Sequence, residues 1–221
     1  MHHAIECQHF SPRYLHAGAR KRAPMGQLLH LVQGAALLRL GQHELLLPAG
    51  SAFWLPAEAL AAFTPLAGCR YVRVRCSLRL PQPSQAGWLT PGPLLSSLLE
   101  SLTDWQRPRE WQGPYGQRLQ VIHDELLHHA LQPQAHDALQ LAWQALARGE
   151  EGAEVSWNRL GGALIDADAL VSQWQLVQAL RLLKGGNKAD TLPGKLGLTP
   201  AALEQASLRW LGCPLADGLA G

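Results

Sequence analysis

The chain has 221 residues, of which 47% are hydrophobic, and a formal net charge of +2 at neutral pH. This length suits one large domain or two small ones, and the apolar fraction is ordinary for a protein that folds around a core. No apolar run approaches the roughly 18 residues of a membrane-spanning helix. The first residues also lack the basic and apolar segments of a secretory signal.

The cysteine content bears on the cellular compartment. The chain has four cysteines, at positions 7, 69, 76 and 213, and no two of them form a Cys-x-x-Cys pair. They are too few and too scattered for a disulfide scaffold, so free thiols in a reducing environment are the simplest interpretation. We therefore expect a cytoplasmic protein with no membrane segment.

The first eighty residues alternate apolar and polar side chains in the manner of half-buried β-strands. Gly34, Gly41 and Pro48 interrupt the alternation, and tight turns at these positions would join the runs as antiparallel strands. We predict strands over residues 27–33, 36–40, 43–47, 52–55 and 70–80.

A segment dense in proline and glycine, residues 81–93, is expected to form a surface connection. Helical spacing of apolar residues then predicts helices over residues 94–105 and 116–131, the second ended by Pro133. From His136 onward the chain is expected to be helical, with glycines between the helices. These later helices are predicted over residues 137–148, 156–164, 167–184, 189–196 and 200–211.

The order of these elements predicts an α+β protein, with N-terminal antiparallel strands followed by an all-helical C-terminal domain. We expect the strand domain in residues 1–80, a linker and helical arm in residues 81–134, and the helical domain in residues 135–221.

Landmarks along the strand region carry a family resemblance. Gln27, Gly34, Pro48 and the turn Trp54-Leu55-Pro56 follow the order found in the cupin-like sensor barrel of AraC-type (AraC/XylS) transcription regulators, which this region resembles. The resemblance implies a barrel that senses a small-molecule effector and a C-terminal domain that binds DNA. It also implies a homodimer formed through the helical arm.

The C-terminal third is similar to the DNA-binding domain of that family but departs from it at one place. In the family, two helix-turn-helix units are joined by a long helix, which residues 175–186 match well. The second unit is matched by residues 195–203 and the closing Gly212-Cys-Pro214. In the first unit, about a dozen residues are missing before Trp174, and Asp166 and Asp168 stand where basic side chains would enter the major groove.

The second helix-turn-helix unit therefore supplies the candidate DNA-binding residues, although Pro193 falls inside its first helix and would break or kink it. Residues 135–221 contain seven Lys or Arg and nine Asp or Glu, a slightly acidic balance that opposes strong DNA binding. Scattered solvated side chains are the alternative interpretation. The DNA-binding candidates are Lys188, Lys195, Thr199, Gln205 and Arg209.

A candidate ligand site lies in the strand region. Tyr71, Arg73, Arg75 and Ser77 alternate along one strand and would share a face, where arginines could bind an anionic small molecule. An exposed basic sheet face is the alternative, and the run Arg20-Lys21-Arg22 is a solvated loop or a contact for an acidic partner. The ligand-pocket candidates are Gln27, Trp54, Tyr71, Arg73 and Arg75.

We expect no metal, no cofactor and no enzymatic activity. Cupin-like barrels that hold a metal place histidines near positions matched here by residues 20–27 and 54–62, and neither stretch contains one. His123, His128 and His129 do not have the spacing of a helical zinc motif and read as a solvated face. The chain also lacks Gly-x-Ser-x-Gly, a phosphate loop and Gly-x-Gly-x-x-Gly.

The sequence is compatible with three functional hypotheses. The first is an AraC-like regulator that keeps DNA contact through its second helix-turn-helix unit. The second is a relative that no longer binds DNA and acts as a ligand-binding or protein-binding module. The third, a barrel-based enzyme, would require three convergent metal ligands inside the barrel.

Overall fold

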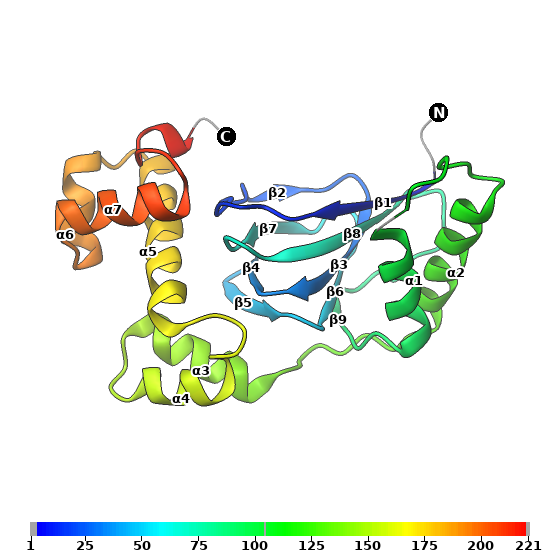
Figure 1. Cartoon of the computed structure of the whole chain (residues 1–221), viewed down its shortest axis with the longest axis horizontal. Helices are drawn as coiled ribbons and strands as arrows, with labels where there is room; N and C mark the ends of the chain where they lie inside the picture. The colour runs from blue at the N-terminus through cyan, green and yellow to red at the C-terminus, as the bar shows by residue number, and fades with distance from the viewer. Residues whose placement is uncertain (1–3, 104, 220–221) are drawn as a thin grey trace. The chain divides into compact units, whose positions relative to one another are not determined.

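The computed structural model describes residues 4–103 and 105–219, and it has β-strands in its first part and helices after them (Figure 1). This order confirms the α+β class predicted from the sequence, a β domain followed by a helical one. The strands are β1 (Ile5–Phe10), β2 (Lys21–Arg22), β3 (Gly26–Gln33), β4 (Ala35–Leu40), β5 (His43–Pro48), β6 (Ala52–Leu55), β7 (Leu60–Pro65), β8 (Arg70–Cys76) and β9 (Gly87–Leu89). The α-helices are α1 (Pro93–Thr103), α2 (Pro114–His128), α3 (Asp137–Arg148), α4 (Ala153–Leu160), α5 (Ala167–Lys184), α6 (Leu192–Leu196) and α7 (Pro200–Trp210). A short 3-10 turn, η1 (Ala189–Thr191), precedes α6, and another, η2 (Asp217–Leu219), follows α7.

The strands form two sheets. The first has the order β1-β8-β3-β6-β9, and the second has the order β2-β7-β4-β5. In the first sheet β8 pairs antiparallel with both β1 and β3, which makes it a central strand. In the second sheet β4 and β5 form a hairpin through Gly41, whose φ of +62° suits the turn that the sequence predicted there.

Most of the predicted strands agree with the structure to within one residue, but the strand expected over residues 70–80 ends at Cys76. The extension to Leu80 was wrong because residues 77–80 form turns, in which the Leu80 amide donates to the Ser77 carbonyl. Strands β1, β2, β7 and β9 were not predicted. Two of these are only two or three residues long, and β7 is rich in alanine, which has weak strand propensity.

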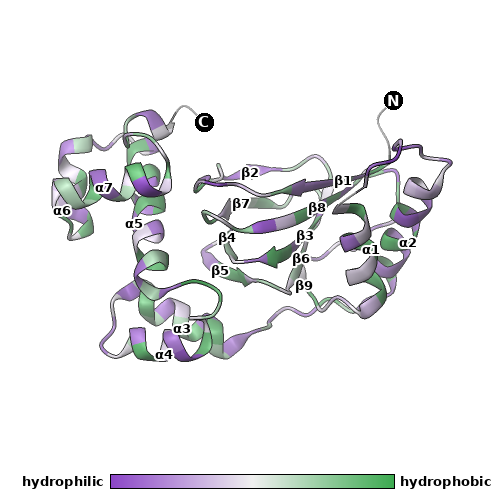
Figure 2. Cartoon of the chain, viewed as in Figure 1, coloured by the Kyte–Doolittle hydropathy of each residue, from purple (hydrophilic) through white to green (hydrophobic). Residues whose placement is uncertain are grey.

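One face of the first sheet packs against helices α1 and α2 to form the core of the β domain. Trp54, Leu28 and Val74 lie in this core with no more than 1% of their surface exposed. Helix α1 contributes Leu95, Leu99 and Leu102, and α2 contributes Tyr115, Leu119, Ile122 and Leu126, at the spacing of one helical face. In Figure 2 both the strands and the helices mix hydrophobic (green) and hydrophilic (purple) residues, as expected of elements with one buried side.

Helices α3 and α5 have the predicted bounds, whereas α2 ends earlier than expected. The prediction that α2 reaches Leu131 was wrong, because the backbone of His129 is extended and Gln132 pairs with Trp88 of β9 through two hydrogen bonds of 2.8 Å. Pro193 stands in the first turn of α6, after the 3-10 turn η1. A proline in the first turn costs the helix no hydrogen bond. The predicted interruption of the helix therefore falls between η1 and α6, and α6 itself is not kinked.

The chain folds into two compact units that are not the same as its linear halves. The β unit comprises the chain up to Ser11, residues 20–62 and residues 69–135. The helical unit comprises the helices from His136 onward, together with residues 12–19, which follow β1, and residues 63–68, which include the end of β7 and the turn before β8. None of the described helices is long and apolar enough to cross a membrane.

Candidate functional site

The face of the first sheet that points away from α1 and α2 carries a group of polar and aromatic side chains. Paired residues of antiparallel strands share a face, so the register of β1, β8 and β3 arranges these side chains in three rows. We call this surface the Arg73 face. Its rows are Glu6, Arg75 and Gln27; Gln8, Arg73 and Leu29; and Phe10, Tyr71 and Leu31.

Arg73 lies at the centre of this face. Its guanidinium donates a hydrogen bond of 2.8 Å to Oε1 of Gln8 and stands 4.6 Å from the centroid of the Phe10 ring. The Phe10 ring in turn stacks on Tyr71, with centroids 4.8 Å apart and an angle of 11° between the planes. The Nε atom of Arg73 is buried, and the described residues offer it no hydrogen-bond partner. Because a buried, unsatisfied donor on a cation is costly, this atom is a candidate contact for an anion.

The electrostatics of the Arg73 face are those of two crowded cations. Burial, and secondly the charge of Arg75, lower the pKa of Arg73 below its usual range. Burial raises the pKa of Tyr71, against the opposing effect of Arg73, so its phenol is neutral at physiological pH. Glu6 is the one carboxylate in the three rows and lies 3.9 Å from Arg75, an ion pair at the long end of the range. The three rows thus hold two cations and one carboxylate, and an added anion would offset the remaining positive charge.

The five predicted ligand-site residues do not all lie together. Gln27, Tyr71, Arg73 and Arg75 share the Arg73 face, whereas Trp54 pairs with Leu28 and faces the core beneath α1 and α2. The Trp54 indole N–H donates 2.9 Å to the Pro83 carbonyl, so its role in the structure is packing. Ser77 falls just beyond the end of β8.

Sequence reasoning missed Gln8 and Phe10, the two side chains that contact the Arg73 guanidinium. Both lie on β1, a strand that was not predicted. The available signal was the alternation of polar Glu6, Gln8 and His9 with buried Ile5 and Cys7, which is imperfect because His9 follows Gln8 directly.

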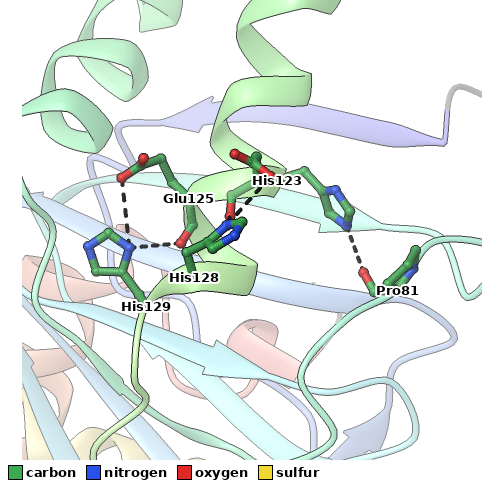
Figure 3. A network of polar contacts seen from close by, with 6 residues as sticks. Pro81, His123, Glu125, His128 and His129 are labelled. Atoms are coloured by element: carbon green, nitrogen blue, oxygen red, sulfur yellow. Dashed lines mark hydrogen bonds and ion pairs between the residues drawn. The ribbon is translucent and has the colours of Figure 1, made fainter.

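The histidines at the C-terminal end of α2 and just after it contact backbone carbonyls and neighbouring carboxylates, as Figure 3 shows. His123 donates to the Pro81 carbonyl at 2.7 Å, and His128 and His129 each contact the residue one turn earlier, Asp124 and Glu125. Within residues 4–103 and 105–219, no group of three or more His, Cys, Asp or Glu side chains converges on a metal position. Burial raises the pKa of the Cys7 and Cys76 thiols to about 12, which leaves them protonated and unreactive.

The long helix α5 organises the helical unit. Asp166 accepts a hydrogen bond of 2.9 Å from the Ala169 amide and so caps the N-terminus of α5. Only residues 161–166 separate α4 from α5, and they form turns. The position where the sequence resemblance called for a DNA-reading helix is thus occupied by the turn and cap that begin α5.

All five predicted DNA-binding residues are exposed side chains on or beside α6 and α7. Three of them have local partners: Thr199 caps α7 through a 3.1 Å bond from the Ala202 amide, Lys195 donates to the Asn187 amide oxygen, and Arg209 lies 4.4 Å from the centroid of the Trp210 ring. Lys188 is the exposed residue that precedes η1, and Gln205 is an exposed residue of α7.

Comparison with known proteins finds similarity in structure alone. No protein-family model and no curated protein matches the chain. Among solved structures, the chain is similar to unsaturated fatty acid bound wild-type ToxT from Vibrio cholerae, with 8% identity, coverage of 97% of this chain and 94% of that chain, and a TM-score of 0.37. It is similar to the AraC-like transcriptional activator CuxR, with 12% identity, coverage of 87% and 81%, and a TM-score of 0.47. It is also similar to a cupin superfamily protein from Desulfitobacterium hafniense, with 13% identity, coverage of 35% of this chain and 71% of that chain, and a TM-score of 0.33. At these identities the likeness is one of fold alone.

Proposed function

We propose that this protein is an AraC-like transcription regulator whose β unit binds a small anionic effector on the Arg73 face and whose helices α6 and α7 contact DNA. The observation that carries the proposal is the buried Nε–H of Arg73, which has no acceptor among the described residues and sits beside a second arginine. A carboxylate fits this arrangement because it can accept from the guanidinium edge while its negative charge offsets both cations.

The residues around Arg73 indicate what the rest of the effector is like. In the same rows, Leu29 and Leu31 are buried, and the Phe10 and Tyr71 rings stack on one another. An apolar chain or ring attached to the carboxylate would therefore meet apolar neighbours, whereas inorganic phosphate would not. We assign the effector to the class of carboxylates with an apolar tail.

Isothermal titration of the full-length protein with sodium decanoate tests this assignment. Decanol and inorganic phosphate separate the contributions of charge and tail, and we expect binding of decanoate but of neither control. The Arg73→Leu variant should lose that binding, and Arg70→Leu, which removes an exposed arginine from the same strand, should retain it. Equal binding of decanoate by both variants would exclude the Arg73 face as the site.

The DNA-binding part of the proposal rests on α6, α7 and the turn between them. Lys188, Lys195 and Arg209 are exposed cations in this region, and cations at such positions bind phosphates without reading sequence. Gln205 lies at the middle of α7, the helix whose side chains would reach base edges in a helix-turn-helix complex. With one reading helix per chain, we expect modest affinity and a strong dependence on salt.

Fluorescence anisotropy with the native upstream duplex and a scrambled duplex, across a salt series, tests DNA binding. A preference for the native duplex that weakens steeply with salt would support the regulator. Lys188→Gln should lower the slope of log affinity against log salt by about 0.9, as expected for the loss of one phosphate contact. The absence of binding at low salt by folded protein would retire this half of the proposal.

A protein of the same lineage that does not bind DNA is the second candidate. It is favoured by the excess of acidic over basic side chains from residue 135 onward, nine against seven, and by the use of Asp166 as a helix cap where a DNA-reading helix would begin. In this case the Arg73 face would still bind decanoate, so the two experiments together separate the candidates.

We further propose that the protein forms a homodimer through its helical arm. The support is on α2, where Val121 and Leu127 are each 40% exposed on either side of Asp124. Sedimentation velocity of the wild type and of a Val121→Glu, Leu127→Glu double variant tests this, since the variant should sediment as a monomer. A monomeric wild type at micromolar concentration would contradict it.

A further inference from the structure

One segment from the N-terminal part of the chain folds with the helical unit and lies against the end of α7. This segment, residues 12–19, follows β1. The Leu15 amide donates a hydrogen bond of 2.7 Å to the Trp210 carbonyl at the C-terminus of α7, and Leu15 is only 5% exposed. The Tyr14 ring packs so closely on Gly212 that a Cβ on this glycine would come within 2.6 Å of the ring. The segment is therefore held beside the helix that we propose to read DNA.

Hydrogen bonds hold the backbone on both sides of Arg13. Before it, the Pro12 carbonyl accepts a hydrogen bond of 3.0 Å from the Gly68 amide. Gly68 ends residues 63–68, the other strand connection in the helical unit. After it, the Leu15 amide is bonded to α7. The fold therefore presents Arg13, an exposed arginine from near the start of the sequence, beside a helix near its end.

Two exposed arginines at this end of α7 are each stacked on an aromatic ring. The guanidinium carbon of Arg13 lies 5.2 Å from the centroid of the Tyr14 ring, and that of Arg209 lies 4.4 Å from the centroid of the Trp210 ring. Contact with a ring face uses the plane of a guanidinium and leaves its N–H donors, which point outward in that plane, available to an acceptor. Stacking also restricts the side chain, so less conformational entropy is lost when a ligand binds.

The charge of the two arginines is not offset by a neighbouring carboxylate. Among the residues that the structure describes, none of the ion pairs involves Arg13 or Arg209. Glu204, the acidic residue of α7, stands five positions before Arg209 and so about 140° away around the helix. Guanidinium N–H donors match phosphate oxygens in both geometry and charge. Two exposed guanidinium groups without a counter-charge therefore have the chemistry of a phosphate site.

We infer that Arg13 and Arg209 together bind DNA backbone phosphates at the C-terminal end of α7. The inference rests on the proposed function and extends its DNA-binding surface to a residue from the N-terminal part of the chain. A helix that lies in the major groove has phosphates on both sides, and the C-terminal end of such a helix can contact the backbone. DNA is favoured over an acidic protein because both arginines lie at the end of the helix proposed to enter the groove. Phosphate contacts carry no sequence information, so this pair adds affinity without specificity.

Fluorescence anisotropy of full-length variants with the native upstream duplex and a scrambled duplex, across a salt series, tests the inference. Arg13→Gln should lower the slope of log affinity against log salt by about 0.9 on both duplexes, and a double variant with Arg209→Gln should lower it by about 1.8. Arg13→Lys keeps the charge and should keep the wild-type slope. Arg159→Gln is the matched control, because it removes one exposed arginine of the same unit from α4, which lies well apart from α7 (Figure 1). It should leave the slope unchanged.

The outcomes separate this inference from the proposed function. If the wild type binds DNA and Arg13→Gln keeps its slope, the inference alone is overturned. An equal loss in Arg13→Gln and Arg159→Gln would overturn it as well, since the effect would then follow net charge and not position. A loss confined to the native duplex would contradict the assignment to phosphate. If the wild type binds neither duplex at low salt, the inference fails together with the DNA-binding half of the proposed function.

Discussion

The Arg73 face and the α6–α7 pair were both expected to bind negatively charged partners, and their side chains are arranged in different ways. On the Arg73 face the cations are partly buried, aligned by strand register and left with an unsatisfied donor. On α6 and α7 the candidate side chains are exposed, and Thr199, Lys195 and Arg209 contact their own neighbours. Burial makes an unsatisfied donor costly, whereas an exposed side chain is satisfied by water.

The Arg73 face therefore has a stronger physical reason to bind an anion than α6 and α7 have to bind DNA. A buried Arg73 Nε–H that lacks an acceptor among the described residues is costly without a ligand, so the Arg73 face has a clear physical reason to bind an anion. The exposed lysines on and beside α6 are solvated by water, so their presence costs no folding free energy and does not by itself indicate a bound anion.

The sharpest test of whether the β unit and the helical unit each have a core of their own uses their buried tryptophans. Trp54 and Trp157 are both completely buried, the first beneath α1 and α2 and the second in α4, where its indole donates 3.0 Å to the Ile165 carbonyl. We expect Trp54→Ala and Trp157→Ala each to lower the free energy of unfolding by about 3–5 kcal/mol. Urea denaturation measures the loss, and hydrogen exchange should locate it in a different unit for each variant. A loss below about 1 kcal/mol would contradict the burial.

On the Arg73 face, the effect of a substitution on decanoate affinity and its effect on fold stability are expected to differ. Arg73→Leu should weaken decanoate binding about 100-fold, or about 2.7 kcal/mol, because the charge and its hydrogen bonds are lost. The same change should leave the fold as stable or slightly more stable, since it removes a partly buried, unsatisfied cation. Titration calorimetry and thermal unfolding measure the two quantities. A clear loss of stability with unchanged binding would mean that Arg73 is structural.

Thr199 allows helix capping and DNA contact to be separated on α7. Thr199→Ala should cost about 1 kcal/mol of stability because it removes the cap on the Ala202 amide. Thr199→Asp should keep the cap, since aspartate is a good capping residue, yet weaken DNA binding through repulsion of phosphate. Thermal unfolding and anisotropy measure the pair. Unchanged DNA binding by the aspartate variant would place the DNA contact elsewhere.

The smallest expected effect is a pH dependence of the β unit through His30. Burial lowers the pKa of His30 below its usual 6.5, against the opposing effect of its hydrogen bond to the Ser51 carbonyl. Below pH 6.5 the unfolded chain therefore takes up a proton that the folded chain resists, and stability falls as the pH drops through the folded-state pKa. Urea denaturation at several pH values should show a flatter acid limb for His30→Gln. An identical limb in the variant would show that other groups set the acid sensitivity.

The sequence predicts local features of this protein better than it predicts which features meet. The alternation around Arg73 correctly put Tyr71, Arg73 and Arg75 on one face, because side-chain direction within a strand has a fixed period of two. It could not place Trp54 relative to them, since the relation between two strands depends on their register. It also could not show that the face is partly buried, because that depends on Phe10 and Gln8 from a strand more than sixty residues away in sequence.

The helical unit shows the same limit. Asp166 before a predicted helix is a capping signal in the sequence alone, and the start of α5 at residue 167 was predicted correctly. The connections at residues 12–19 and 63–68 gave no such signal. The Leu15 amide meets its acceptor, the Trp210 carbonyl at the end of α7, only in the folded chain. In the same way, Gln173 of α5 becomes the acceptor of the Ala67 amide only when α5 packs beside it.

The most direct test of the account is to observe the Arg73 Nε–H itself. In a nuclear magnetic resonance titration of labelled full-length protein with sodium decanoate, the arginine Nε–H signals are followed, with Arg73→Lys assigning the signal of interest. The account predicts that the Arg73 proton moves downfield and exchanges more slowly as decanoate saturates, because it gains a carboxylate acceptor. An Arg73 signal that stays unchanged at saturation would show that the Arg73 face does not bind the anion.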